Sequence, residues 1–213
     1  MSIKERKLTP AEQKRKENFE KICEKMAQNG YVRKDLTVGI LQANIFAILI
    51  MLPFIAVTWI IYRAVNPDSS IYLSLGTIMI LFLAMLLLTV LHEAIHGLTW
   101  SIFAKSHFKA IRFGIIWEAL TPYCTCADPL TKSQYMIGSA MPTLILGFGP
   151  AAVAVIFGSF PLLVLSLLMI FGGGGDFLIL LKMLFYRTKN KEVLYYDHPY
   201  ECGVVAFEKA AEK

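Results

Sequence analysis

Two histidines and a glutamate form the pattern in this sequence with the clearest chemistry. His92, Glu93 and His96 occur in the run His-Glu-Ala-Ile-His, so the two imidazoles are four residues apart and share one face of a helix. Imidazole nitrogens at this spacing can bind zinc, and a carboxylate beside them can accept a proton from zinc-bound water. The alternative is a chance match, because so short a pattern occurs in many unrelated chains.

The surroundings of this motif favour the metal site over a chance match. Residues 77–91, directly before it, are almost entirely Leu, Ile, Met, Phe and Ala. Ionisable side chains in a lipid-spanning helix cost roughly 2.5–3.5 kcal/mol each on insertion scales, so they seldom occur there without a function. We therefore predict that the apolar run at residues 73–103 carries a metal centre.

A catalytic zinc ion takes three protein ligands and leaves one position for water, so a third ligand is required. Asp176 is the best candidate, because it is the only acidic residue in the last two apolar segments of the chain. His92 and His96 lie about 9–13 residues before the basic end of their run, and Asp176 lies about 11 residues before Arg187. At 1.5 Å per helical residue, all three fall at a similar depth, within roughly 20 Å of the membrane boundary.

Other interpretations of the candidate ligands stay open at this point. Asp176 could instead be a structural partner of Lys182 or of a backbone donor. His198 is the rival third ligand, although a histidine before proline is commonly a turn residue. Cys124 and Cys126 are a weaker metal signal: their side chains would point the same way from a strand, but no second cysteine pair follows.

The composition indicates a membrane protein of one domain. The chain has 213 residues, of which 56% are hydrophobic and only 17% are charged. The formal net charge is +5, and about half of all Lys and Arg lie in residues 1–37, before the first long apolar run. This segment predicts contact with an anionic membrane surface. Nucleic-acid binding is not favoured, because the basic residues alternate with Glu and no aromatic stacking platform accompanies them.

Hydropathy predicts an all-α membrane protein with about four transmembrane helices. A basic amphipathic segment at residues 1–37 contains a helix at 10–28, the membrane core comprises residues 38–186, and a tail comprises 187–213. Alternating apolar residues within 105–135 predict a small cytoplasmic β-hairpin or loop. The four apolar segments are residues 38–62, 71–103, 137–157 and 160–186.

The distribution of Lys and Arg predicts that both termini are cytoplasmic. With four spans, only Arg63 falls on the outer side. The cysteines then lie in reducing segments, so we expect no disulfide. These cysteines are Cys23, Cys124, Cys126 and Cys202.

Several motifs together resemble a known family. The motifs are His92-Glu93-Ala94-Ile95-His96, Tyr123-Cys124-Thr125-Cys126, Met141-Pro142 with Gly149-Pro150, Gly174-Gly175-Asp176 and Asp197-His198-Pro199. Over about residues 70–205 they look like the bacterial membrane family described as "Putative zincin peptidase". More remotely, the layout is similar to the site-2-type intramembrane zinc metalloproteases.

The resemblance implies a role for each motif residue. His92, His96 and Asp176 match the zinc ligands, and Glu93 matches the catalytic acid/base. The chain departs from the site-2 type in two respects: Phe177 rather than glycine follows the aspartate, and the assisting asparagine has no match in the third span.

The function expected from the sequence is that of a membrane-embedded zinc metallopeptidase. Zinc and Glu93 would activate the water that hydrolyses peptide bonds of membrane-associated substrates. The expected partners are the lipid bilayer and a peptide or membrane-protein substrate, without nucleic acid, in a multi-pass protein of the bacterial cell membrane. Two alternatives are a non-catalytic zinc-binding membrane scaffold and a small transporter that binds an ion at the glycine-rich break in the fourth span.

Overall fold

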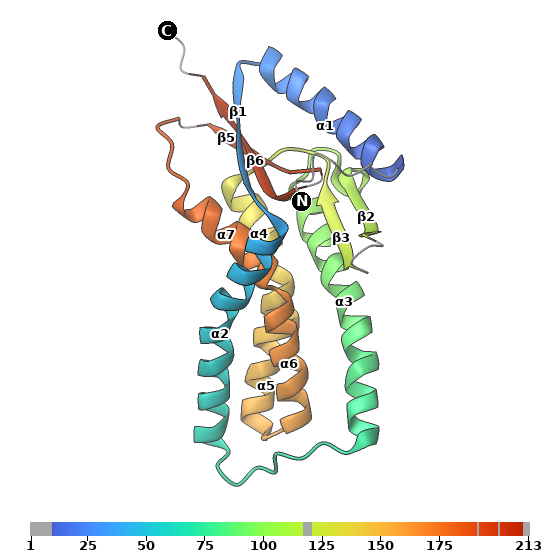
Figure 1. The fold of residues 1–213 in the computed structure, drawn as a ribbon, viewed down its shortest axis with the longest axis vertical. Coiled ribbons are helices and arrows are strands. Elements are labelled where there is room, and N and C mark those ends of the chain that lie inside the picture. Colours follow the sequence, from blue (N-terminus) through green and yellow to red (C-terminus); the bar gives the residue numbers. More distant parts are fainter. Residues whose placement is uncertain (1–9, 117–120, 191, 200, 211–213) are drawn as a thin grey trace.

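The computed structural model describes residues 10–116, 121–190, 192–199 and 201–210. A helical bundle occupies one end of the molecule, and a sheet with a helix across it occupies the other end (Figure 1). The helices are α1 Pro10–Gln28, α2 Ile40–Val65, α3 Leu75–Phe103, α4 Lys132–Thr143, α5 Gly149–Phe157, α6 Phe160–Gly172 and α7 Gly174–Phe185. The strands are β1 Tyr31–Val38, β2 Ile111–Ile116, β3 Thr121–Cys126, β4 Leu130–Thr131, β5 Val193–Asp197 and β6 Cys202–Lys209.

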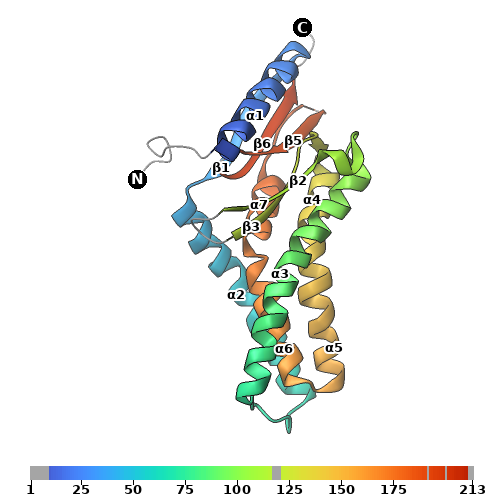
Figure 2. The same ribbon diagram turned by 90° about the vertical axis from the view of Figure 1, so that its right-hand side faces the viewer.

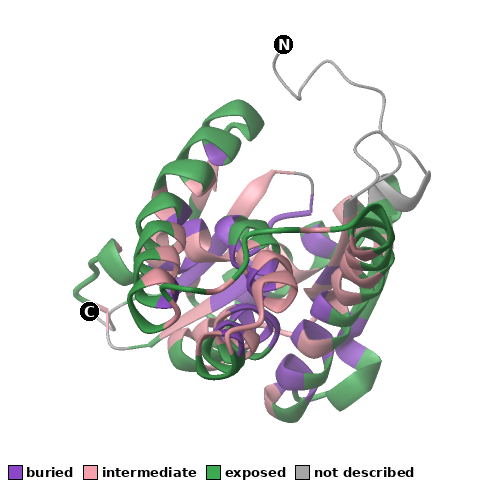
Figure 3. Ribbon diagram, turned by 90° about the horizontal axis from the view of Figure 1, so that it is seen from below, coloured by how far each residue is buried: buried purple, intermediate pink, exposed green. Residues whose placement is uncertain are grey.

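Three helical segments of the described chain are long and apolar enough to cross a membrane. They are α2, α3 and the segment from Lys132 to Phe157, which joins α4 to α5. A fourth crossing results if α6 and α7 count as one span, since they are bent by 46° at the break between them. Much of the surface of these helices is exposed (Figure 3), and many of the exposed residues are large and apolar, as expected of surfaces that lipid covers. The prediction of about four membrane helices is confirmed to this extent.

The protein is mostly helical, as predicted, but it is not all-α, because both ends of the chain also contribute to a four-stranded antiparallel sheet. Its order is β1-β6-β5-β4, and β1 pairs with β6 along its whole length, from Tyr31 opposite Lys209 to Val38 opposite Cys202. The segments predicted as a basic segment and a tail therefore pair with each other. The reason is the apolar run of β6, which needs cover on both faces and cannot stay in a solvated tail.

Helix α1 covers one face of this sheet (Figure 2). The predicted helix at residues 10–28 is observed with the same bounds. Its apolar stripe packs Phe19 and Met26 against Tyr196, Val205 and Phe207 of the sheet. Phe19 is only 2% exposed, so this side of the helix is occupied by protein. The structure thus favours a helix packed on its own domain over a helix lying on the membrane.

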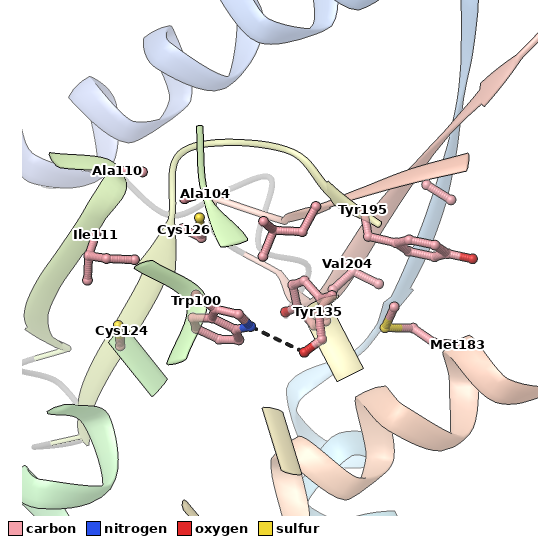
Figure 4. Close-up of a cluster of buried hydrophobic side chains, with 12 residues drawn as sticks. Trp100, Ala104, Ala110, Ile111, Cys124, Cys126, Tyr135, Met183, Tyr195 and Val204 are labelled. Carbon is pink, nitrogen blue, oxygen red and sulfur yellow. Dashed lines mark hydrogen bonds between the residues drawn. The ribbon is translucent and has the colours of Figure 1, made fainter. Parts of the chain in front are cut away.

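The opposite face of the sheet packs on the ends of the membrane helices. Val204 and Ala206, which alternate with Val205 and Phe207 along β6, belong to a second core with Trp100 and Tyr135 (Figure 4). Successive strand residues point to opposite faces, so β6 joins both cores. This second core fixes α3 and α4 relative to the sheet.

A β-hairpin follows α3, as the sequence predicts. β2 and β3 are antiparallel, with Ile111 opposite Cys126 and Phe113 opposite Cys124. The hairpin lies against α3, because a Cβ on Gly97 would come within 2.5 Å of the Phe113 ring. Residues 117–120, which include the predicted ends of both strands, lie outside the described residues.

Two irregular helical breaks bring α4 and α7 together. A π-helical turn, Leu144–Phe148, joins α4 to α5, and Gly173 separates α6 from α7. Pro142 removes a helical N–H just before the first break, which loosens the hydrogen-bond ladder there. At the second break, a Cβ on Gly173 would lie 2.0 Å from Thr143 Oγ1, so only glycine permits this approach. The break at Gly173 places the first turn of α7 beside the cavity described below.

Candidate metal centre

The sequence motif lies on the half of α3 nearest the sheet. His92 and His96 are buried, at 8% and 3% exposure, and their ring centroids are 4.8 Å apart. Two side chains one helical turn apart meet in this way whenever both turn towards the same neighbour. The histidines therefore present their nitrogens together to the interior of the molecule.

Asp176 meets both histidines from the first turn of α7. His92 Nε2 lies 3.1 Å from Asp176 Oδ2, and His96 Nε2 lies 3.3 Å from Asp176 Oδ1. One ligand atom from each of the three side chains falls within 4.8 Å of the other two. Ligand atoms at 2.0–2.2 Å from a tetrahedral zinc are roughly 3.3–3.6 Å apart. The two separations to Asp176 are close to this spacing, so small side-chain movements would let the three residues hold one such ion. The three residues predicted to lie at a similar depth are thus in contact with one another.

Two neighbouring groups, the Gly138 carbonyl and the Trp100 ring, fix the orientation of the His96 imidazole. Its Nδ1 donates to the carbonyl oxygen of Gly138 in α4 over 2.9 Å, which leaves Nε2 free of hydrogen for a metal. The Trp100 ring stacks on the imidazole with centroids 4.9 Å apart. Trp100 Nε1 in turn donates to the carbonyl oxygen of Tyr135 (Figure 4). The first turns of α4 therefore hold the second histidine in place.

Substitution of Gly138 with Ala is expected to disturb this support. A Cβ at position 138 would lie 2.0 Å from Trp100 Nε1, so the indole must move away from His96. Overpacking of this kind costs about 1–3 kcal/mol, which lowers the thermal midpoint by roughly 2–4 °C per kcal/mol in a chain of this size. Thermal unfolding in detergent measures the change. Gly76→Ala is the control because its Cβ would have ample space, and equal midpoints for the two variants would contradict the prediction.

Glu93 lies beside the histidines without joining the three ligands. It lines the same cavity as His92 and His96, half-buried, and its carboxylate is within hydrogen-bonding reach of the Cys124 backbone in β3. A carboxylate in this position can accept a proton from a water held at the fourth ligand position and return it to a neighbouring atom. The hairpin thus flanks the group that would transfer protons.

A cavity of about 770 Å³ contains these side chains, and we call it the central cavity. Its walls come from α2, α3, α4, α6, α7, β3 and β5, with the end of β1 and the start of β6, so segments from both ends of the chain line it. Its polar lining beyond the motif residues comprises Asn44, Tyr123, Tyr135, Lys182 and Asp197. The volume suits a short stretch of extended peptide.

The rival assignments from the sequence do not meet at this centre. His198 Nδ1 accepts a hydrogen bond from the Glu201 backbone N–H, and its ring packs edge-on against Phe19 beneath α1. Lys182 donates to the carbonyl oxygen of Thr37 and forms no ion pair with Asp176. These two contacts exclude the structural pairing of Asp176 with Lys182 and place His198 in the sheet region.

The cysteines are all free thiols. Cys124 lines the central cavity, whereas Cys126 is buried in the core beneath the hairpin. Neither belongs to the group of three metal ligands found among the described residues. Burial raises the pKa of both thiols, so they stay protonated and are poor metal ligands.

Asp197 is a polar residue of the cavity that sequence reasoning missed as a functional group. Its carboxylate accepts hydrogen bonds from the Cys126 backbone N–H, over 3.0 Å, and from the Tyr135 hydroxyl. Burial raises the pKa of Asp197 to about 6. Its sequence signal was the Asp197-His198-Pro199 motif, but an acidic residue in a predicted polar tail is usually solvated, so no role was assigned to it.

Asp197 is expected to make stability fall as pH rises from 5 to 7. A carboxyl group whose pKa is raised by folding contributes stability below its ordinary pKa, near 4, and loses that contribution as pH passes through about 6. At 1.4 kcal/mol per pKa unit, the loss between pH 5 and pH 7 is about 1 kcal/mol. Unfolding measured at both pH values should show this loss in the wild type and not in Asp197→Asn. An identical pH dependence in the two proteins would contradict the assignment.

The fold and the site together define a mostly helical protein with membrane-length helices and a cluster of two buried histidines and a partly buried aspartate. Residues 85–190, about half of the chain, match the family described as "Putative zincin peptidase", and the chain belongs to this family. The matched segment contains His92, Glu93, His96 and Asp176. No curated protein and no solved structure matches the chain. The similarity to site-2-type metalloproteases stays a prediction.

Proposed function

We propose that the protein is a membrane-embedded zinc metallopeptidase that hydrolyses peptide bonds of membrane-associated substrates. The observation that carries the proposal is the convergence of His92, His96 and Asp176 on one point, with Glu93 in the same cavity. The family description supports zinc as the ion. Three protein ligands leave a fourth position for water, which is the arrangement of catalytic rather than structural zinc sites.

Zinc bound there supplies a Lewis acid and lowers the pKa of its water ligand towards ~7. Glu93 complements the ion, because its carboxylate accepts the proton of the attacking water and then donates it to the leaving amine nitrogen. His96 keeps its orientation through Gly138 and Trp100, so its geometry need not reorganise during the reaction. The lining of the cavity is mostly apolar, which lowers the local dielectric and so strengthens the charge interactions within it.

The substrate must present an extended segment to this site. Helical amides are hidden by their own hydrogen bonds, so a membrane-spanning substrate has to unwind locally before attack. The hairpin strand β3 borders the cavity at Cys124, where an extended chain could lie beside it. Placement in the bacterial cell membrane with both termini cytoplasmic is part of the proposal, supported by the excess of Lys and Arg at the sheet end of the molecule.

The proposal is tested by comparing substrate cleavage by the wild type and by Glu93→Gln. The alternative of a non-catalytic zinc scaffold predicts zinc binding in both proteins and turnover in neither. A purified wild-type protein that binds zinc but cleaves no peptide or membrane substrate would therefore favour the scaffold. The alternative of a transporter predicts no cleavage by the wild type or by Glu93→Gln.

A further inference from the structure

A line of polar side chains runs from the metal centre towards the sheet along the contact between α2 and α7. The two helices are antiparallel and pack closely, since a Cβ on Gly174 would lie 3.0 Å from the Cβ of Ala47. Towards the sheet, Lys182 Nζ donates to the Thr37 carbonyl oxygen over 2.7 Å. These two contacts fix the register of the helix pair. The position of any residue between them along the helix axis then follows from the rise per residue.

Asn44 and Lys182 occupy successive levels of this line. Asn44 lies three residues from Ala47 in the direction of the sheet, and is therefore close to the level of Asp176 on the facing helix. Lys182 lies six residues beyond Asp176, which is about 9 Å along the α7 axis. Both Asn44 and Lys182 line the central cavity.

Lys182 is a half-buried cation without an anionic partner in the described chain. None of the ion pairs found there includes it, and its one hydrogen bond goes to a neutral carbonyl. An ammonium group has three donors, so the Thr37 carbonyl leaves donors available to a ligand. Because Lys182 lines the central cavity, a carboxylate bound there can accept a charge-assisted hydrogen bond from its ammonium group.

We propose that Lys182 forms a carboxylate-binding subsite of the central cavity, which selects substrates with a carboxylate about three residues from the scissile bond. The spacing follows from the distance of about 9 Å between the levels of Asp176 and Lys182, because an extended peptide advances about 3.3 Å per residue. The inference rests on the proposed peptidase function, since it names what part of the substrate the cavity recognises. The carboxylate can be the carboxyl terminus of the peptide or an acidic side chain.

The experiment measures binding of three labelled peptides to the zinc-loaded Glu93→Gln protein in detergent, where cleavage does not interfere. One apolar hexapeptide of Leu and Ala ends in a free carboxylate, a second is its C-terminal amide, and a third is an amide with Glu as its last residue. The free acid is expected to bind about tenfold or more tightly than the plain amide. The third peptide separates the two sources: tight binding shows that a side-chain carboxylate suffices, and weak binding restricts the subsite to the carboxyl terminus.

Added to the Glu93→Gln protein, Lys182→Met should abolish the preference for the acid, so that the acid and the amide bind with equal affinity. Lys182→Gln keeps a hydrogen-bond donor for Thr37 but has no charge, so it tests whether the charge of Lys182, rather than its contact with Thr37, recognises the carboxylate. Like Lys182→Met, it should lose the preference for the acid. Lys189→Met, which removes an exposed lysine after α7, is the matched control. The subsite proposal is overturned if Lys182→Gln keeps the full preference for the acid. It is also overturned if the Glu93→Gln protein with Lys182 intact binds the acid and the amide equally.

Failure of the subsite and failure of the peptidase give different results. Cleavage of acid and amide at equal rates by the wild type would overturn the subsite and leave the peptidase standing. Binding of the acid that depends on Lys182, without cleavage by the wild type, would support the subsite and overturn the peptidase.

Discussion

Replacement of Glu93 with Gln is expected to abolish peptide hydrolysis while zinc stays bound. Glutamine has nearly the same shape as glutamate but cannot accept the proton of the attacking water. General acid/base groups contribute about 10²- to 10⁴-fold to hydrolytic rates, so cleavage should fall by that factor. Zinc should be retained because Glu93 is not one of the three clustered ligands.

The loss is measured as cleavage of a single-span substrate in cells and of labelled peptides by purified protein, with zinc content determined on the same samples. Glu24→Gln is the matched control, since Glu24 is exposed on α1, away from the cavity. Cleavage by Glu93→Gln at the wild-type rate would contradict the peptidase assignment. Loss of zinc together with activity would instead place Glu93 among the ligands.

Replacement of Asp176 with Ala is expected to remove zinc from the protein. Asp176 contacts both imidazoles and supplies the only negative charge among the three ligands. Zinc binding to complete protein sites is worth about 10–16 kcal/mol, so the loss of one of a few ligands should weaken affinity by roughly a hundredfold or more. Hydrolysis should disappear with the metal.

Zinc content after gel filtration and competition with a chelator measure this effect. Asp68→Ala, in the exposed loop between α2 and α3, is the control for loss of a carboxylate elsewhere. Thermal unfolding of the metal-free proteins shows whether Asp176→Ala still folds. Zinc affinity at the wild-type level in a folded Asp176→Ala protein would contradict the assignment of the third ligand.

The cluster of three side chains could be predicted from the sequence because membrane helices impose strong constraints. Four-residue spacing places His92 and His96 on one helix face, and a uniform rise per residue converts sequence position into depth. Asp176 stood out because acids are rare in such segments. The same regularity explains why the membrane-length helices were found close to their observed bounds.

The sheet could not be predicted by the same means. β1 and β6 lie at opposite ends of the chain, and their pairing depends on contacts between distant residues rather than on local periodicity. The apolar run at Val204 to Phe207 was visible, but a short run of this kind is compatible with a strand or a helix. Asn44, Tyr135 and Asp197 were missed for a related reason: only the packing of α2, α4 and β5 brings them to the cavity.

A crystal structure of the purified protein with anomalous scattering recorded at the zinc edge tests the central claim most directly. We expect one anomalous peak at about 2.0–2.2 Å from His92 Nε2, His96 Nε2 and a carboxylate oxygen of Asp176. A zinc-containing protein whose peak lies elsewhere, or whose histidines and aspartate face different surroundings, would contradict the metal centre and the peptidase built on it.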